Sequence, residues 1–309
     1  MATSRRLEGV FCPVVTPFGA GFLPDRGRFI RHCQWLLDQE VGLAIFGTNS
    51  EGNSLTVKEK RTLLDALLEA GQPPTRMMPG TGACALPDTI ELTKHATTAG
   101  CAGVLMLPPF YYKGVSDEGL FRAYASVIEG VADERVRIYL YHIPAVSGVP
   151  ISLALIERLL DSFPDAIAGI KDSSGDSGNI TAMIERFGGR GFEVFAGTEV
   201  LLLSTMRAGG AGCITATSNV NPSAIVRLYK SWRQDDADLQ QEKLTVQRAL
   251  FARFPLISAM KSAIAVKSGN EEWQRVRPPL LELDAGQAAN LIATLDEAGF
   301  DIPNAESLA

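Results

Sequence analysis

The chain has 309 residues, of which 46% are hydrophobic and 21% are charged, and its formal net charge is −6. This length is enough to bury the core of one barrel-sized domain or of two smaller ones. No run of Lys and Arg with interleaved aromatic residues occurs, so we expect neither nucleic acid nor an anionic membrane as a partner. The longest apolar stretches, such as Val104–Phe110, are far too short to cross a bilayer.

The N-terminal segment Met1–Glu8 carries two arginines but no apolar core of the kind that a signal peptide requires. We therefore expect a cytoplasmic protein. The five cysteines include no C-x-x-C pair, and the three histidines show no ligand spacing. These patterns predict buried thiols, no metal site and no cofactor.

Short apolar runs alternate with helical patterns from the N-terminus to about residue 234. Several runs are continuously apolar, which is typical of a parallel sheet covered by helices. The runs predict eight strands: Val10–Thr16, Leu43–Gly47, Arg76–Gly80, Gly103–Leu107, Val136–Tyr141, Ile167–Lys171, Glu193–Ala196 and Gly212–Thr215.

Helix start signals lie between these strands. They are Pro24-Asp25, the capping box Thr56–Glu59, Pro87-Asp88, Ser116–Glu118, Ser152 and Asn221–Ser223. Eight strands, each followed by a helix, predict a (β/α)8 TIM barrel over residues 1–234. A doubly wound sheet is the alternative, but unbroken alternation of this length closes more naturally into a barrel.

Residues 235–309 show three further helical patterns, at Asp238–Phe251, Ile257–Lys267 and Ala285–Ala298. No linker rich in Pro, Gly or Ser separates this tail from the preceding residues. The sequence therefore predicts a C-terminal three-helix extension of the barrel rather than an independent domain.

Lys171 directly follows the apolar run Ile167–Ile170, where a buried strand should end. Burial penalises the ammonium form, so an amine walled in by apolar groups can become neutral and attack a carbonyl. An isolated lysine after a strand is usually a solvated loop residue. Here, however, polar residues concentrate at the strand ends, which is where barrel enzymes place their active sites.

Four segments resemble the dihydrodipicolinate synthase/N-acetylneuraminate lyase family. They are Gly47-Thr48-Asn49-Ser50-Glu51-Gly52, the Tyr141-x-x-Pro144 turn, Gly169-Ile170-Lys171-Asp172 and Val276-Arg277-Pro278-Pro279-Leu280. The resemblance runs from about Val10 to Leu283, with the motifs in the same order and at similar spacing. It implies a pyruvate-dependent class I aldolase, lyase or dehydratase on a (β/α)8 barrel.

The resemblance also implies roles for individual residues. Lys171 would form a Schiff base with a 2-oxo acid, and Tyr141 would move protons beside the nascent imine. Tyr112 corresponds to an aromatic residue that completes the site of a neighbouring subunit. The implied substrate-binding residues are Thr48 and Asn49, which would hold the carboxylate, and Gly197 and Ile214, which would line the imine pocket.

Three positions depart from the family pattern. Asn49 stands where many members have a second hydroxyl residue, so the proton relay differs. Val146 stands where true dihydrodipicolinate synthases carry an arginine that holds the second substrate's carboxylate, and it cannot bind an anion. His142 replaces a small polar residue, and it either contacts the distal part of the substrate or caps its loop. The chain is therefore not a typical dihydrodipicolinate synthase.

We expect a carbon–carbon lyase that cleaves or forms a bond in a 2-oxo acid, with pyruvate and an aldehyde as its small molecules. The leading substrates are 4-hydroxy-2-oxoglutarate or a 2-keto-3-deoxy sugar acid. Dehydration of a deoxy keto acid, dihydrodipicolinate synthesis and keto-acid binding without turnover are the alternatives. The apolar Pro108–Tyr112 loop predicts a homo-oligomer, which we expect to be a homotetramer.

Overall fold

The structure is a computed structural model that describes residues 6–309. Most of the N-terminal segment on which the cytoplasmic prediction depends lies outside the described residues. The described chain folds as two compact units. The first unit consists of residues 6–10 and 73–214, and the second unit consists of residues 11–72 and 215–309.

The strands are parallel, in the order β2-β1-β7-β6-β5-β4-β3. Their bounds are β1 Gly9–Cys12, β2 Gly42–Leu43, β3 Val104–Met106, β4 Ile138–His142, β5 Ile167–Asp172, β6 Glu193–Ala196 and β7 Gly212–Ile214. The last two residues of β1 pair with β2 in the second unit, and β3 to β7 belong to the first unit.

The third predicted strand, Arg76–Gly80, forms no regular strand. It is reduced to a single parallel bridge between Gly80 and Leu105. Proline explains the difference, because it lacks the N–H that a ladder needs. Pro74 begins a 3-10 turn over Pro74–Arg76, and Pro79 contributes only its carbonyl, which accepts from the Leu105 N–H at 2.9 Å.

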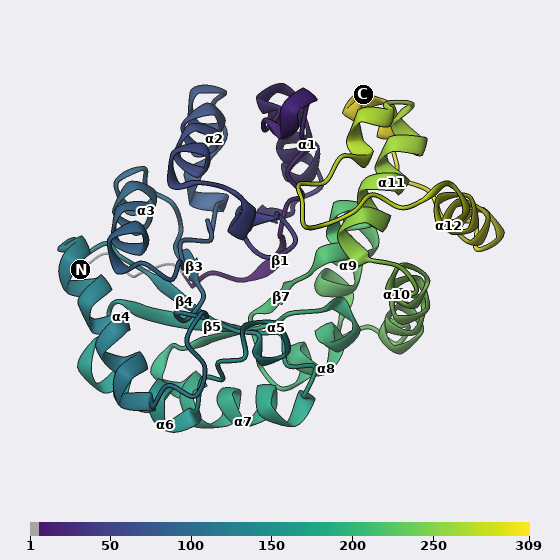
Figure 1. Ribbon diagram of the computed structural model, residues 1–309. Coiled ribbons are helices and arrows are strands. Elements are labelled where there is room, and N and C mark those ends of the chain that lie inside the picture. Colours follow the sequence, from purple (N-terminus) through teal and green to yellow (C-terminus); the bar gives the residue numbers. More distant parts are fainter. Residues whose placement is uncertain (1–5) are drawn as a thin grey trace. The chain divides into compact units, whose positions relative to one another are not determined.

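In the first unit α3 precedes β3, and helices α4, α6, α7 and α8 follow β3, β4, β5 and β6 in turn (Figure 1). In this unit α4 packs on α3 and on α6. Ser116 and Ser152 accept hydrogen bonds from backbone N–H groups of the following turn, so both predicted start signals are confirmed. The bounds are α3 Leu86–Thr98, α4 Asp117–Val131, α5 Pro144–Ser147, α6 Leu153–Ser162, α7 Ser177–Phe187 and α8 Leu202–Arg207.

The second unit contains α1, α2 and the last four helices. Asp25 caps α1, and the predicted capping box of Thr56 and Glu59 is present at the start of α2. The three predicted tail helices are all found, close to their predicted bounds. The helices are α1 Arg26–Asp38, α2 Val57–Glu69, α9 Pro222–Ser231, α10 Ala237–Ala252, α11 Leu256–Ser268 and α12 Ala285–Glu297.

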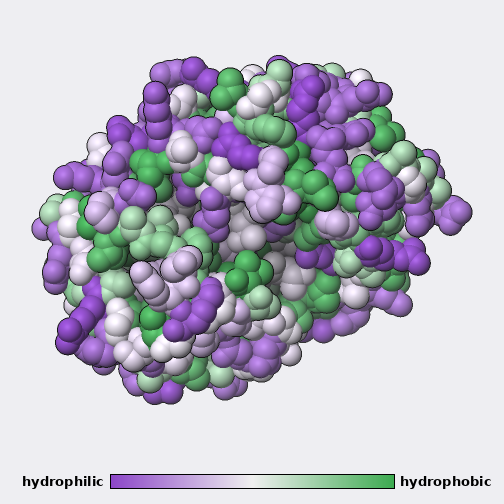
Figure 2. Space-filling view, viewed as in Figure 1, coloured by the Kyte–Doolittle hydropathy of each residue, from purple (hydrophilic) through white to green (hydrophobic). Residues whose placement is uncertain are grey.

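The tail helices α10, α11 and α12 pack on one another within the second unit. The division of the chain at residue 234 stays a prediction, because the tail shares this unit with residues 11–72. Among residues 6–309 no single helix is long and apolar enough to cross a membrane. α10 and α11 together reach the length and hydropathy, but they are bent by 100° at the break between them. Hydrophilic side chains are spread over the face shown in Figure 2, with apolar ones among them.

Candidate active site

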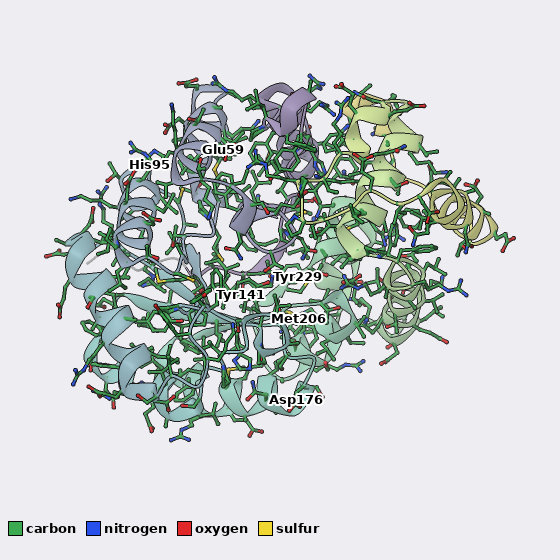
Figure 3. All side chains as sticks on the ribbon, in the orientation of Figure 1. Glu59, His95, Tyr141, Asp176, Met206 and Tyr229 are labelled. Carbon is green, nitrogen blue, oxygen red and sulfur yellow. The ribbon has the colours of Figure 1, made fainter. Side chains whose placement is uncertain are left out.

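Lys171 and Tyr141 meet at the ends of two neighbouring strands. They are register partners on β5 and β4, and each side chain points to the same side of the sheet. The Lys171 Nζ lies 3.2 Å from the Tyr141 Oη and 4.3 Å from the centre of the tyrosine ring. Each residue is only 2% exposed. Tyr141 is labelled among the strands in Figure 3. The structure thus brings together the predicted nucleophile and the predicted proton carrier.

Two buried residues lie on the two strands that follow β5 in the sheet. Phe195 on β6 is the register partner of Lys171 on the other side. Cys213 on β7 is fully buried, and burial raises the pKa of its thiol well above the usual range; the charge of Glu199 adds to this effect, and that of Lys171 opposes it. The thiol therefore stays protonated, and it does not compete with the amine as a nucleophile.

Asp172, the next residue along β5, shapes the loop that follows. Its Oδ1 accepts hydrogen bonds from the Ser174 N–H at 2.7 Å and from the Ser174 hydroxyl at 2.5 Å. Its Oδ2 accepts from the Asn179 side-chain amide at 2.5 Å. Asp176 then caps α7, at the position labelled in Figure 3. Through these hydrogen bonds Asp172 fixes the end of the strand that carries Lys171.

His142 is the register partner of Asp172. Its Nδ1 accepts a hydrogen bond from the Ile151 N–H at 3.0 Å, so the neutral ring carries its proton on Nε2. Burial lowers the pKa of His142, and the nearby Asp172 carboxylate opposes that shift. Of the two roles considered for this residue, the hydrogen bond to Ile151 supports the loop cap.

Gly197 is tied to the Lys171 strand end, because its N–H donates to the Asp172 carbonyl at 2.6 Å. A Cβ on Gly197 would lie 2.1 Å from the Ser173 Oγ and 2.7 Å from the Asp172 carbonyl, so only glycine fits. Strand alternation places Ser173 on the same side as Lys171. No hydrogen bond from its hydroxyl is present within residues 6–309, so this hydroxyl is available to a ligand. Ser173 was not among the predicted site residues.

The remaining predicted residues of the first unit are Ile214 and Tyr112. Ile214 is fully buried on β7, and its role in lining the imine pocket stays a prediction. Tyr112 is 73% exposed and packs edge-on against Tyr111, with ring centroids 5.3 Å apart. Lys113 steadies this loop, because its amine donates to the carbonyls of Phe110 and Ser147. A role of Tyr112 in a neighbouring subunit stays a prediction.

Thr48 and Asn49 belong to the second unit, in the turn that follows β2. Both are half-buried. Within residues 6–309 Asn49 forms no hydrogen bond, so its backbone N–H and side-chain amide are free for a ligand. Free amides in a tight turn can bind a carboxylate. Across the same residues, no group of His, Cys, Asp and Glu side chains is arranged to hold a metal ion.

A buried lysine beside a tyrosine, at the ends of parallel strands that helices follow, can supply the nucleophile and the proton carrier of Schiff-base chemistry. The family model described as "Dihydrodipicolinate synthetase family" matches residues 6–298. The chain therefore belongs to the dihydrodipicolinate synthetase family.

Individual proteins are similar to the chain over almost its whole length. An "Uncharacterized DapA-like lyase" of Chloroflexus aurantiacus is 31% identical, with 94% of this chain and 96% of the relative covered. The "Putative 2-dehydro-3-deoxy-D-gluconate aldolase YagE" of Escherichia coli is 30% identical, with 96% of this chain and 99% of the relative covered.

Solved structures agree. Dihydrodipicolinate synthase from Agrobacterium tumefaciens has a TM-score of 0.87 at 27% identity, covering 94% of this chain and 99% of that one. The structure of YagE from Escherichia coli in complex with pyruvate has a TM-score of 0.86 at 29% identity, and it covers 95% of this chain and 99% of the YagE chain. These findings confirm the predicted family, the TIM-barrel fold and the class of carbon–carbon lyases.

Proposed function

We propose that the protein is a Schiff-base aldolase that cleaves or forms a carbon–carbon bond in a 2-oxo acid, with pyruvate and an aldehyde as the smaller partners. The substrate is a 4-hydroxy-2-oxo acid, such as 4-hydroxy-2-oxoglutarate, or a 2-keto-3-deoxy sugar acid. The observation that carries this proposal is the buried contact of 3.2 Å between the Lys171 amine and the Tyr141 hydroxyl.

The contact supports imine formation. The Lys171 amine adds to the C2 carbonyl of the oxo acid, and the carbinolamine loses its hydroxyl as water. Tyr141 is within reach to protonate that leaving hydroxyl, because its Oη lies at hydrogen-bond distance from the Lys171 Nζ. The product is an iminium ion, which withdraws electrons from C3.

The iminium ion makes the C3–C4 bond breakable. The bonding electron pair moves into the enamine while the C4 hydroxyl gives its proton to the Tyr141 phenolate, which dehydration of the carbinolamine has left deprotonated, and the aldehyde leaves. Tyr141 then returns this proton to C3 of the enamine, and water hydrolyses the resulting iminium ion to release pyruvate and the Lys171 amine. In this scheme Thr48 and Asn49 hold the C1 carboxylate, as the family resemblance implies, and the unpartnered Ser173 hydroxyl is available to the substrate.

Two observations support the substrate class. YagE is named as a putative aldolase of 2-dehydro-3-deoxy-D-gluconate, and its solved structure contains pyruvate. Val146 is apolar and 64% exposed at the position where a typical synthase, by the family resemblance, has its arginine. A carboxylate on the aldehyde half of the substrate therefore has no cationic partner at this position, which favours a 2-keto-3-deoxy sugar acid over 4-hydroxy-2-oxoglutarate.

Borohydride trapping tests the nucleophile. Incubation with pyruvate and borohydride should add a reduced adduct at Lys171, because only an imine is captured in this way. Intact mass and peptide mapping report the adduct and its position. Lys171→Ala should form none, while Lys267→Ala, a control on a lysine of α11, should trap normally. An adduct on a different lysine, or no adduct, would overturn the proposal.

Turnover tests the reaction. Pyruvate release should be measured with a panel of 4-hydroxy-2-oxo acids and 2-keto-3-deoxy acids, and one class should react well above the rest. Tyr141→Phe should keep the borohydride adduct but slow release by about 10²–10⁴-fold, the weight of a positioned acid–base group. Tyr139→Phe on the same strand is the control, because its hydroxyl bonds to Glu193 and not to Lys171.

Three other results of these assays would each indicate one of the alternative functions. A longer oxo acid without pyruvate release indicates dehydration through the same imine. Rapid condensation of pyruvate with aspartate semialdehyde indicates a synthase. An adduct at Lys171 with no reaction of any substrate indicates a keto-acid-binding protein.

A further inference from the structure

We propose that Glu51, Lys261 and Arg277 are positioning residues, through which the C-terminal tail holds the carboxylate turn in its binding form. The carboxylate turn is Gly47–Gly52, the segment that carries Thr48 and Asn49. This inference rests on the proposed function, in which that turn binds the C1 carboxylate of the oxo acid.

The carboxylate turn is tight, and two residues at its ends have unusual backbone angles. Its N–H groups at Ser50 and Gly52 both donate to the Gly47 carbonyl, at 3.1 and 3.0 Å. Phe46 and Glu51 have positive φ angles of 64° and 55°, which residues with a Cβ rarely adopt. Such a conformation persists only where the surroundings fix it. The turn therefore needs support from outside itself.

Within residues 6–309 the hydrogen bonds to the Glu51 side chain come from the tail, whereas Thr16 supports the turn through its hydroxyl, which donates to the Ser50 carbonyl at 2.7 Å. The Glu51 side chain is fully buried, with 0% exposed, and so is the side chain of Lys261 on α11. One carboxylate oxygen of Glu51 accepts from the Lys261 amine, and the other accepts from the Arg277 backbone N–H at 2.8 Å. Lys261 also donates to the Arg275 carbonyl at 2.8 Å, so it joins the turn to the tail segment 275–277.

The side chain of Arg277 fixes the same tail segment, 275–277, to α2. Its guanidinium donates to both carboxylate oxygens of Glu59 on α2, at 2.8 and 3.1 Å. It also donates to the Ser54 carbonyl, just beyond the turn. The Lys261 amine and the Arg277 guanidinium both lie over the ring of Phe18, at 4.6 and 4.8 Å from its centre.

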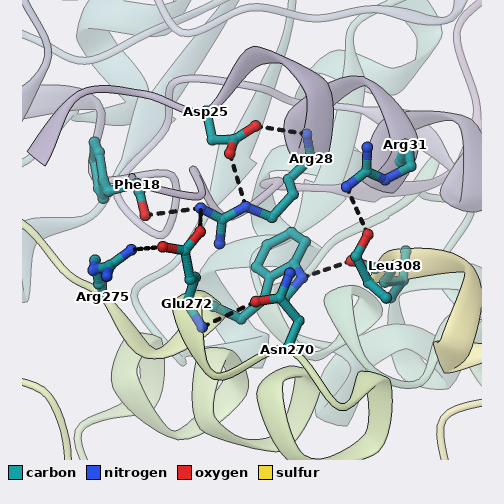
Figure 4. A network of polar contacts seen from close by, with 10 residues as sticks. Phe18, Asp25, Arg28, Arg31, Asn270, Glu272, Arg275 and Leu308 are labelled. Atoms are coloured by element: carbon teal, nitrogen blue, oxygen red, sulfur yellow. Dashed lines mark hydrogen bonds and ion pairs between the residues drawn. The ribbon is translucent and has the colours of Figure 1, made fainter. Parts of the chain in front are cut away.

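The tail segment is anchored in turn on α1 (Figure 4). Glu272 accepts from Arg28 at 3.0 Å and from Arg275 at 2.5 Å. Asp25 holds the same Arg28 side chain at 3.0 Å. The chain of contacts thus runs from α1 through residues 272–277 to Glu51, so a displacement of the tail would be transmitted to the carboxylate turn.

A buried ion pair is a poor source of stability, because two apolar side chains of similar volume stabilise a core at least as well. The contribution of this contact is the orientation of the Glu51 side chain. The Lys261 amine and the Arg277 backbone N–H donate to its two carboxylate oxygens and thereby fix that orientation. Because Glu51 follows Ser50 directly, that orientation fixes the backbone on which the free amides of Asn49 are presented. We therefore assign the pair to ligand binding rather than to stability.

The test is the pyruvate concentration that gives half-maximal borohydride trapping at Lys171. Single changes leave one buried charge unpaired, so Glu51→Gln should be combined with Lys261→Met. The double variant should be trapped to the same extent as the parent at saturating pyruvate. Its half-saturating pyruvate concentration should rise by about ten- to a hundredfold, because a hydrogen bond to the pyruvate carboxylate is lost and a bond to a charged group is worth about one to two decades in affinity. The matched control is Lys267→Met, which removes an ion pair of 3.2 Å to Asp296 from the same helix.

Arg277→Gln provides a second arm that leaves the buried pair intact. It should raise the half-saturating concentration less than the double variant does, and Arg277→Lys should restore part of the loss. An unchanged half-saturating concentration in a folded double variant would overturn the inference. If the double variant does not fold, Arg277→Gln decides the question in the same way. Absence of any adduct in the parent protein would instead refute the proposed function.

Discussion

His32 is a fully buried imidazole on α1, and it illustrates how one residue makes stability depend on pH. Its Nε2 faces the Asn219 carbonyl at 3.4 Å, and its ring meets Trp273 edge-on at 5.3 Å. Its Nδ1 has no hydrogen-bond partner in the described part of the chain. Burial lowers the pKa of His32 from 6.5 to about 4, against a weaker opposing effect of the Asn219 carbonyl.

This pKa predicts a loss of stability in mild acid. Below pH 6.5 the unfolded chain binds a proton at His32 that the native state does not accept until about pH 4. The free energy of unfolding should therefore fall as the pH drops from 6.5 to 4, by roughly 3 kcal/mol from this group. Urea unfolding at pH 7, 6, 5 and 4 measures the slope. His32→Phe, which keeps a ring beside Trp273, should flatten it.

His95→Phe is the control, because His95 lies half-buried near the end of α3. Glu59 acts in a different window: the Arg277 side chain lowers its pKa to about 2, so its contribution is lost only as the pH falls from 4.5 to 2. A His32→Phe variant that keeps the slope of the parent between pH 6.5 and 4 would contradict the prediction.

Single residues also show how far the sequence reveals the site. Lys171 could be singled out because it directly follows an apolar run and strand ends converge in a barrel. Tyr141 was singled out by the family resemblance, and the roles of both residues stay predictions. The contact between Glu51 and Lys261 could not, because 210 residues separate them and no local pattern marks a pair. Ser173 was missed because a serine in a loop looks like any turn former; the space it takes beside Gly197 is visible only in three dimensions.

At the scale of elements, the sequence predicted whether a segment is a helix or a strand more accurately than it predicted where that segment begins and ends. The strand at Glu193–Ala196 matches its prediction, whereas β2 is only Gly42–Leu43 and not Leu43–Gly47. The residues after β2 are apolar up to Phe46, so composition favours a longer strand. The chain instead turns there, with a positive φ at Phe46, because it must enter the carboxylate turn.

The pairing of β5 with its neighbours leads to a prediction for Gly169. A Cβ at this position would lie 2.2 Å from the Glu193 carbonyl oxygen on β6, which belongs to the backbone and cannot rotate away. Gly169→Ala should therefore separate β5 from β6 and lower the free energy of unfolding by about 1–3 kcal/mol, the usual cost of overpacking. Chemical denaturation would measure the loss.

Gly189→Ala serves as the control for this change, because a Cβ there would meet no atom within 4 Å. Since β5 also carries Lys171, the Gly169→Ala variant should show slower borohydride trapping at Lys171 as well. A Gly169→Ala variant with the same free energy of unfolding as the parent would contradict the prediction, because it would show that β5 and β6 can separate without loss of stability.

At the scale of the whole molecule, exposed apolar side chains bear on assembly. Tyr111 and Tyr112 are each 73% exposed in the loop after β3, and Val146 is 64% exposed. Lys113 joins these two segments, because its amine bonds to carbonyls on both sides. An exposed apolar loop in water favours contact with another protein surface, and a second copy of the same chain is the common solution.

We therefore predict a homotetramer, with a mass in light scattering at micromolar concentration of four times the 33.2 kDa of the chain. Replacing both Tyr111 and Tyr112 by Glu should shift the mass to smaller species, because the charges would have to be buried in the contact. Leu281→Glu, at a leucine that is 80% exposed in the second unit, should leave the mass unchanged. Tyr112→Phe should keep the assembly and slow pyruvate release if the hydroxyl serves the site of a neighbouring subunit. A monomer at micromolar concentration would refute the assembly, whereas unchanged turnover in Tyr112→Phe would refute only the role of the hydroxyl.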